Sequence, residues 1–164
     1  MGKVILICGK IGSGKTTYAN ELAKRVNAVN ISQDELMLGL FGAEFYRTEP
    51  KKYEEYCARV ETYVKRKAGE AAKAGAIVIC ENGFWSRSER DGLRKLYSDM
   101  GVPCELHYID TPQEQRLKNI ERRNAEIRRG NSHFYLTGEQ DIHHFFEIPD
   151  DSEIDVRVKQ PASL

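Results

Sequence analysis

The stretch from Gly9 to Thr16 reads GKIGSGKT and fits the pattern G-x-x-x-x-G-K-[ST] at every position. Its glycines permit backbone conformations that direct successive N–H groups into one concavity. Lys15 can reach the β- and γ-phosphates of a nucleoside triphosphate, and the Thr16 hydroxyl can ligate Mg²⁺. These residue types at this spacing therefore predict a nucleoside triphosphate site.

The residues on either side of this loop supply the context that the motif requires. An apolar run, 4–8, precedes it and a helical stretch, 17–26, follows it, which gives the order buried strand, glycine turn and helix N-terminus. The helix start adds a partial positive charge, so a polyphosphate is held by backbone dipoles as well as by Lys15. We expect nucleotide contacts from Gly9, Lys10, Ile11, Gly12, Ser13, Gly14, Lys15, Thr16 and Thr17.

The length and the charge of the chain narrow the classes of function. Residues 1–164 are predicted to form one domain, because a chain of this length can bury a sizeable core. The formal net charge of zero argues against bulk electrostatic binding to nucleic acid or to a membrane surface. No apolar run is long enough to span a membrane and no charged-then-apolar leader opens the sequence, so we expect a cytoplasmic protein.

Apolar runs and amphipathic stretches alternate along the chain in the way that is typical of α/β proteins. Four apolar runs and a fifth, amphipathic one are predicted as strands: 4–8, 28–31, 76–80, 104–109 and 154–158. Helical patterns occupy 16–26, 50–74, 86–100, 112–127 and 138–146, with a short helix at 35–40. This alternation predicts a five-stranded parallel sheet with helices on both faces, built around a P-loop NTPase core.

Polar side chains follow the predicted strands at the edge of the sheet where ligands bind in such folds. The P-loop follows the first strand, and Asp34 lies just beyond the second. Glu81 follows the third strand and Asp110 the fourth. Three of the four buried strands therefore deliver a carboxylate to the same edge as the phosphate-binding loop.

At this point the chain resembles the small P-loop kinases of the AAA_33 family, which include relatives of phage polynucleotide kinase, chloramphenicol phosphotransferase and zeta toxins. The resemblance covers nearly the whole chain and is carried by GKIGSGKTTYANELA, NISQDELMLGLFG, VICENGFWSRSERDGLRK, YIDTPQEQRLKNIERRN and FFEIPDDSE. It implies a nucleoside-monophosphate-kinase-like core with a lid at approximately 124–138. It also implies ATP and Mg²⁺, and transfer of the γ-phosphoryl group to a hydroxyl.

Asp34 is the candidate general base for this transfer. A carboxylate that accepts the proton of the acceptor hydroxyl fits phosphoryl transfer, and the matching aspartate has that role in polynucleotide kinases. The alternative is that Asp34 caps the following helix, but Ser32 can act as the N-cap and leave Asp34 free. The resemblance places Mg²⁺ on Thr16 and Glu81. Relatives carry aspartate where this chain has Glu81, and a glutamate can act on the metal through water with a different reach.

A second group of candidates is the basic stretch around Arg116, Arg122 and Arg123, which precedes a polar, glycine-containing segment. It resembles the lid of these kinases, in which an arginine stabilises the transition-state charge while the closed lid excludes water. The alternative is a solvated helix face with acidic partners. The resemblance implies that Arg123 contacts phosphate, that Arg116 is an adenine-side contact, and that the Pro149 backbone lies against the adenine.

Three functions remain open from the sequence. The first is a kinase that phosphorylates a hydroxyl of a small molecule; the second is a polynucleotide 5′-hydroxyl kinase, which the neutral overall charge disfavours. The third is an ATP-binding regulatory module without an acceptor substrate. The segment with Tyr46 and Tyr53 should carry the acceptor identity. Trp85 could line the acceptor pocket or could cover the edge of the sheet. Arg87 and Arg90 could bind an acidic acceptor, although a salt-bridged surface role is favoured. The acceptor and the oligomeric state are not defined by these patterns.

Overall fold

A five-stranded parallel sheet forms the centre of the molecule, as the sequence predicts. The computed structural model describes residues 2–130 and 135–159. The strands are β1 (Lys3–Cys8), β2 (Val29–Ser32), β3 (Ile77–Glu81), β4 (Cys104–Asp110) and β5 (Val156–Lys159). They lie in the order β2-β3-β1-β4-β5, and every neighbouring pair is parallel. The α/β fold class with a parallel five-stranded sheet is therefore confirmed.

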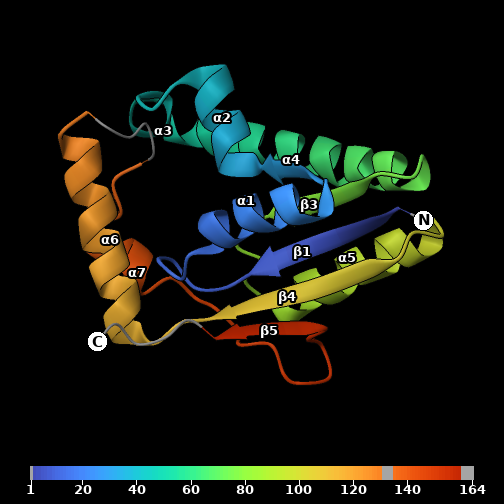
Figure 1. The fold of residues 1–164 in the computed structure, drawn as a ribbon. Coiled ribbons are helices and arrows are strands. Elements are labelled where there is room, and N and C mark those ends of the chain that lie inside the picture. The colour runs from blue at the N-terminus through green and yellow to red at the C-terminus, as the bar shows by residue number, and fades with distance from the viewer. Residues whose placement is uncertain (1, 131–134, 160–164) are drawn as a thin grey trace.

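Helices cover both faces of this sheet. They are α1 (Lys15–Val26), α2 (Gln33–Phe41), α3 (Phe45–Thr48), α4 (Pro50–Lys73), α5 (Arg87–Asp99), α6 (Gln113–Arg128) and α7 (Glu139–Ile142). Figure 1 shows α1 on one face, α4 and α5 on the other, and α6 standing beyond the ends of the strands. No helix in the described part of the chain is long and apolar enough to cross a membrane.

The two-residue alternation of strand β1 explains why both faces of the sheet are covered. Ile5 and Ile7 belong to the core cluster that contains Ala19 and Leu22 of α1. The alternate residues of β1, namely Val4, Leu6 and Cys8, belong to the cluster that contains residues of α4 and α5. Successive side chains of a strand point to opposite faces, so a continuous apolar run can be buried only between two layers of helices.

The two helices that follow β2 and β3 begin differently from the helix that follows β1. Ser32 caps α2, because its hydroxyl accepts from the backbone N–H of Glu35 at 3.3 Å. Ser86 caps α5 in the same way, with the N–H of Glu89 at 3.2 Å. Helix α1 instead starts after Gly14, which has φ +93° and no side chain to offer. The first N–H groups of α1 therefore have no side-chain cap, and they face the phosphate loop.

The helix predicted at 138–146 is shorter in the structure. It ends at Ile142, and the chain then runs without regular secondary structure back toward the end of β3. The backbone N–H of Glu147 donates to the carbonyl of Trp85 at 2.8 Å, and the Glu147 carboxylate accepts from the backbone N–H of Arg87 at 2.8 Å. These tertiary bonds replace the helical ones. The structure also adds α3, which the sequence did not predict.

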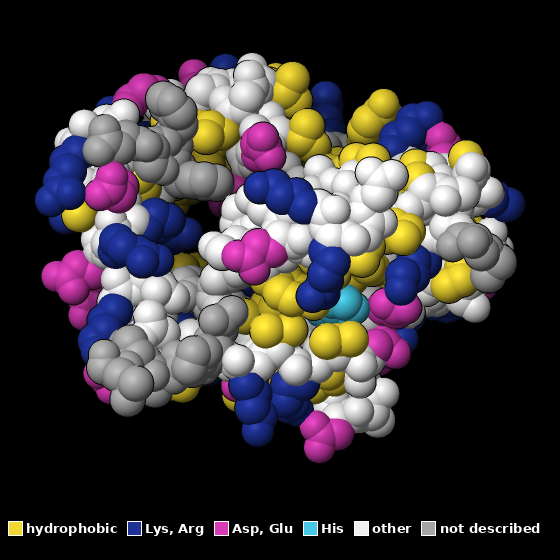
Figure 2. Space-filling model, in the orientation of Figure 1, with side chains coloured by type: hydrophobic (Ala, Val, Ile, Leu, Met, Phe, Trp, Pro, Cys, Tyr) yellow, Lys and Arg dark blue, Asp and Glu magenta, His cyan; other side chains and the backbone are white. Residues whose placement is uncertain are grey.

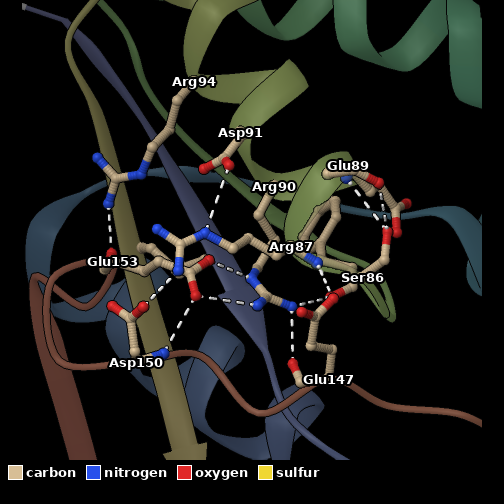
Figure 3. Close-up of polar contacts among 12 residues, drawn as sticks. Ser86, Arg87, Glu89, Arg90, Asp91, Arg94, Glu147, Asp150 and Glu153 are labelled. Carbon is tan, nitrogen blue, oxygen red and sulfur yellow. Dashed lines mark hydrogen bonds and ion pairs between the residues drawn. The ribbon is translucent and has the colours of Figure 1, made fainter.

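A buried ion pair fastens this returning segment to the sheet (Figure 3). The Arg90 side chain is 1% exposed, and its guanidinium binds both carboxylate oxygens of Glu153 at 2.8 and 3.2 Å. Its remaining nitrogen donates to the carbonyls of Phe84 and Glu147 at 3.1 and 2.9 Å. The favoured prediction of a salt-bridged Arg90 is correct, but the prediction that it lies at the surface is wrong, because α5 and the segment around Glu153 enclose it.

Replacing Glu153 by alanine should therefore destabilise the protein strongly. The variant would leave the guanidinium of Arg90 buried without its counter-charge, which costs about 3–5 kcal/mol of the free energy of unfolding. Urea denaturation followed by far-UV circular dichroism measures this loss. The matched control is Lys95→Ala, which breaks the ion pair between Lys95 and Asp99. Because the Lys95 side chain is 75% exposed, this variant should change the free energy of unfolding by about 1 kcal/mol or less. Equal losses in the two variants would contradict the structural role of the buried pair.

Candidate active site

The P-loop connects β1 to α1 in a conformation that requires glycine. Gly12 and Gly14 have φ values of +79° and +93°, in the left-handed region that residues with a Cβ rarely adopt. A Cβ at Gly12 would also lie 2.6 Å from the carbonyl oxygen of Arg116, so helix α6 packs directly on the loop. The loop is thus fixed by both its own dihedral angles and its neighbour.

Side chains of α6 and of the β4–α6 connection bind three successive carbonyl groups of the P-loop. The Arg116 Nε donates to the Ile11 carbonyl at 3.0 Å, and the Asn119 amide donates to the Gly12 carbonyl at 2.9 Å. The Thr111 hydroxyl donates to the Ser13 carbonyl at 2.8 Å. With these acceptors satisfied on one side, the loop can present N–H donors to an anion on the other.

Lys15 lies at the start of α1 and bends back over the loop. Its ammonium donates to the carbonyls of Gly9 and Lys10 at 2.8 and 3.2 Å. Burial lowers its pKa to about 8, although the nearby carboxylates of Glu81 and Asp34 act in the opposite direction. Because this pKa lies near neutral pH, the charged form of Lys15 is stabilised when a polyphosphate brings negative charge beside it.

Two carboxylates face this lysine from the neighbouring strand ends. Asp34, in the first turn of α2, is open to the cavity, and Glu81, at the end of β3, is only 7% exposed. Desolvation raises the pKa of both carboxyls, while Lys15 lowers it in each case. The nearby Thr16 hydroxyl also lowers the pKa of Glu81, whereas Glu81 Oε1 is buried without a hydrogen-bond partner in the described part of the chain.

These residues line one large cavity of about 1140 Å³ at the carboxyl ends of the strands. Its walls come from the P-loop, from the segments after β2 and β3, from α3 and α4, from α6, and from residues 135–137 and Asp141. Figure 2 shows a hollow between the α6 side and the body of the molecule, with Lys and Arg side chains along its α6 border. Its volume exceeds that of a typical single-ligand pocket, which gives room for a nucleotide and an acceptor together.

Arg122 and Arg123 line the cavity from α6. The Arg123 side chain binds the hydroxyl of Thr137, while its Nε is buried without a partner among the described residues. Burial lowers the pKa of this guanidinium, and the charges of Asp34 and Asp141 act against that effect. Arg123 therefore shares the cavity with Asp34 and Lys15, as its predicted phosphate contact would require.

The structure places most predicted site residues on the cavity wall but not all of them. The lining includes Ile11, Gly12, Ser13, Gly14, Lys15, Thr16, Thr17, Asp34, Glu81 and Arg123. Gly9 and Lys10 stand behind it and bind the ammonium of Lys15 through their carbonyls. Arg116 and Pro149 are buried outside the lining. The guanidinium of Arg116 binds the Ile11 carbonyl of the P-loop, and the adenine-side roles of both residues stay predictions.

Several residues of this site escaped the sequence reasoning. Asn119 fixes the P-loop, and its position one helical turn after Arg116 was the only signal that could have indicated a shared face. Asn82 donates to the side chain of Gln33 at 2.6 Å and links the ends of β2 and β3. Glu61 and Tyr135 reach the cavity from elements far apart in the sequence. The predicted lid limits, 124–138, include the end of α6 and also residues 131–134, which lie outside the described chain.

The oxygen atoms beside Thr16 suit a magnesium ion. The Thr16 hydroxyl and the unpartnered Oε1 of the buried Glu81 are hard oxygen donors next to the predicted phosphate position. Mg²⁺ binds such sites through one or two protein oxygens together with substrate phosphates and water. Thr16 and Glu81 are therefore the residues that would hold it.

Comparison with known proteins identifies relatives of this chain. The family model AAA_33, described as an AAA domain, matches residues 4–140. A cytidylate kinase of Pyrobaculum islandicum is 39% identical over 79 residues, which cover 46% of this chain and 42% of that protein. The matched region thus spans less than half of this curated relative.

Solved structures share the fold at lower identity. An APS kinase of Mycobacterium tuberculosis, solved in complex with AMPPNP and APS, has a TM-score of 0.68 at 22% identity, covering 99% of this chain and 90% of that chain. A gluconokinase of Sinorhizobium meliloti has a TM-score of 0.62 at 16% identity, covering 98% and 85%. At these identities the likeness shows the fold of this chain.

The lowered pKa of Lys15 leads to a pH-dependent affinity for ATP. The ammonium is present below a pH of about 8 and is lost as the pH rises through that value, so the attraction to phosphate disappears with it. The dissociation constant of a fluorescent ATP analogue with Mg²⁺ should increase about tenfold or more between about pH 7 and about pH 9.5. The control is Lys15→Arg, whose side chain stays charged throughout this range and whose profile should be flat. A parent profile as flat as that of the control would contradict the assignment.

Proposed function

From the premise that the chain belongs to the AAA_33 family, we propose that it is an ATP-dependent kinase that transfers the γ-phosphoryl group to a hydroxyl of a small-molecule acceptor. The observation that carries this proposal is the meeting of Lys15, Asp34 and Arg123 in one cavity. A site that only binds a nucleotide needs Lys15 and Arg123 but has no need of Asp34. The free carboxylate of Asp34 supplies what a transfer to a hydroxyl requires in addition.

Asp34 has the surroundings of a general base. Ser32 caps helix α2, so the Asp34 carboxylate is not needed for that purpose. Desolvation raises its pKa toward the range in which a carboxylate accepts a proton more readily, while the charges of Lys15 and Arg123 act to lower that pKa. In the proposed mechanism Asp34 accepts the proton of the acceptor hydroxyl as its oxygen attacks the γ-phosphorus.

The remaining residues position and neutralise the phosphates. The P-loop N–H groups and the uncapped start of α1 hold the β-phosphate, and Lys15 and Arg123 face the charge that spreads over the transferred group. Mg²⁺, when bound through Thr16 and Glu81, would neutralise further phosphate charge. Arg122 also lines the cavity. The proposal further includes a single domain over residues 1–164, in which α6 and the residues after it form a lid.

A polynucleotide 5′-hydroxyl kinase and an ATP-binding regulatory module are the two rival functions. A polynucleotide kinase requires cations along the path of its acceptor strand. A regulatory module that transfers no phosphate does not require a base beside the γ-phosphate position. Acceptor-dependent release of ADP separates the kinase from the module, because a module should show only slow hydrolysis that no acceptor accelerates.

Asp34→Asn tests the proposed base. The amide keeps the shape of the side chain but cannot accept the proton, so acceptor phosphorylation should fall by about a hundredfold or more. Binding of ATP should change little, since the P-loop and Lys15 hold the nucleotide. Turnover with a responsive acceptor and nucleotide affinity are measured on the same preparation.

Glu35→Gln is the matched control for this variant. Glu35 follows Asp34 in the first turn of α2, but its side chain is exposed and lies outside the cavity lining. The Glu35→Gln variant removes one negative charge and should keep turnover within about twofold of the parent protein. If Asp34→Asn also retains parental turnover, Asp34 is not the base and the kinase proposal loses its main support.

A further inference from the structure

The lysine and arginine side chains of the cavity lie on one side of it, which Glu126 and Asp141 also line. We call the acceptor half the lining residues from the segments after β2 and β3, from α3 and α4, and Tyr135: Gln33, Asp34, Tyr46, Tyr53, Glu61, Glu81, Asn82, Trp85, Glu89 and Tyr135. Among these described residues are four carboxylates and no lysine or arginine. The cations of the lining, Lys15, Arg122 and Arg123, lie on the P-loop and α6, where the nucleotide phosphates require them.

The arginines that could have served an acidic acceptor are engaged elsewhere. Arg90 is buried and binds Glu153, and Arg87 pairs with Asp150 and Asp91 (Figure 3). Neither of them lines the cavity. A phosphate or sulfate on the acceptor would therefore enter a half-cavity without a counter-charge and would face carboxylates, which is unfavourable in a partly desolvated site.

Two of the carboxylates have partners, and the charge of Glu61 is offset by an ion pair whereas that of Glu89 is not. Glu89 uses one oxygen to accept from the backbone N–H of Trp85 at 2.9 Å, and a neutral donor does not cancel its charge. Glu61 pairs with Lys65, which is outside the lining. Glu81 Oε1 is buried without a hydrogen-bond partner among the described residues. The acceptor half therefore keeps a net negative charge even when Mg²⁺ occupies its place beside Glu81.

Aromatic rings complete this half of the cavity. Tyr46 of α3, Tyr53 of α4 and Tyr135 form a mutual cluster, with ring centroids 5.1, 5.5 and 6.0 Å apart. Tyrosine and tryptophan rings attract ammonium groups through their π faces, and carboxylates nearby add to this attraction. Trp85 lines the same half. The walls thus combine the two elements of an amine-binding site.

We propose that the acceptor is a hydroxyl compound that carries a positively charged amino group and no phosphate. This inference rests on the proposed kinase function, because it concerns the acceptor of that same cavity. The ammonium would lie between the carboxylates of Glu61 and Glu89 and the tyrosine cluster, which leaves a hydroxyl of the same compound for Asp34.

Binding can be measured without catalysis, because Trp85 is the single tryptophan of the chain and lines the acceptor half. The protein with Mg²⁺ and a non-hydrolysable ATP analogue is titrated with amine-bearing compounds, namely glucosamine and aminoglycosides, and its intrinsic fluorescence is recorded. Glucose, glucose 6-phosphate and a 5′-hydroxyl oligonucleotide are titrated in parallel. We expect the amine-bearing compounds to bind at least about tenfold more tightly than the others.

The double variant Glu61→Gln/Glu89→Gln tests whether the carboxylates cause this preference. The glutamine at position 89 can still accept from the N–H of Trp85, so the start of α5 is preserved. The amine-bearing compounds should lose about tenfold in affinity, while glucose and the ATP analogue bind as to the parent protein. The matched control is Glu55→Gln, which removes a carboxylate of the same helix α4 that pairs with Arg59 outside the cavity. It should leave every affinity unchanged.

The outcomes separate this inference from the function on which it rests. Equal or tighter binding of the phosphate-bearing sugar or the oligonucleotide, or no binding by any amine-bearing compound, would overturn it. So would an unchanged preference in the double variant. An amine-bearing compound that binds but does not stimulate ADP release would count against the kinase proposal. The inference that the ligand carries a positively charged amino group would still stand.

Discussion

The site depends on one constraint: a backbone loop can bind phosphate through its N–H groups only if its carbonyl groups are satisfied elsewhere. In this molecule Arg116, Asn119 and Thr111 bind three successive carbonyls of the P-loop. Helix α6 must therefore lie beyond the ends of the strands and pack on Gly12. That same placement brings Arg122 and Arg123 into the cavity. One helix thus shapes the anion site and supplies part of its charge.

The electrostatics of the site follow from putting one ammonium and two carboxylates in a common, partly desolvated space. Each group would be costly alone, and the ammonium of Lys15 reduces the cost of each carboxylate as they reduce its own, although the two carboxylates repel each other. Burial lowers the pKa of Lys15 and raises those of Asp34 and Glu81, while their mutual attraction opposes all three shifts. The charges are therefore poised to respond to a ligand, which is the condition that phosphoryl transfer places on its surroundings.

The residues that could be predicted from the sequence are those whose position follows from local pattern. The apolar run of β1 and the glycine loop after it define the sheet and the site, and Ser32 is the N-cap that frees Asp34. The positions of Arg90 and Arg116 could not be predicted in the same way. Both are arginines on amphipathic helices, and only the tertiary partners, Glu153 and the Ile11 carbonyl, show that their side chains are buried and hold neighbouring segments in place. The helix predicted at 138–146 stops early for the same reason, because bonds to Trp85 and Arg87 outweigh its local helical preference.

The missing side-chain cap of α1 links the stability of the fold to bound nucleotide. The α2 and α5 helices carry their own serine caps, whereas the first turn of α1 is left for phosphate oxygens to complete. The ligand-free protein is accordingly the less stable species, and bound nucleotide adds a stabilisation that grows with the logarithm of its concentration, about 2.7 kcal/mol at a hundred times the dissociation constant. Resistance to heat and to proteases is then shared between the polypeptide and the metabolite. A cell depleted of nucleotide would lose this protein faster than one that is well supplied.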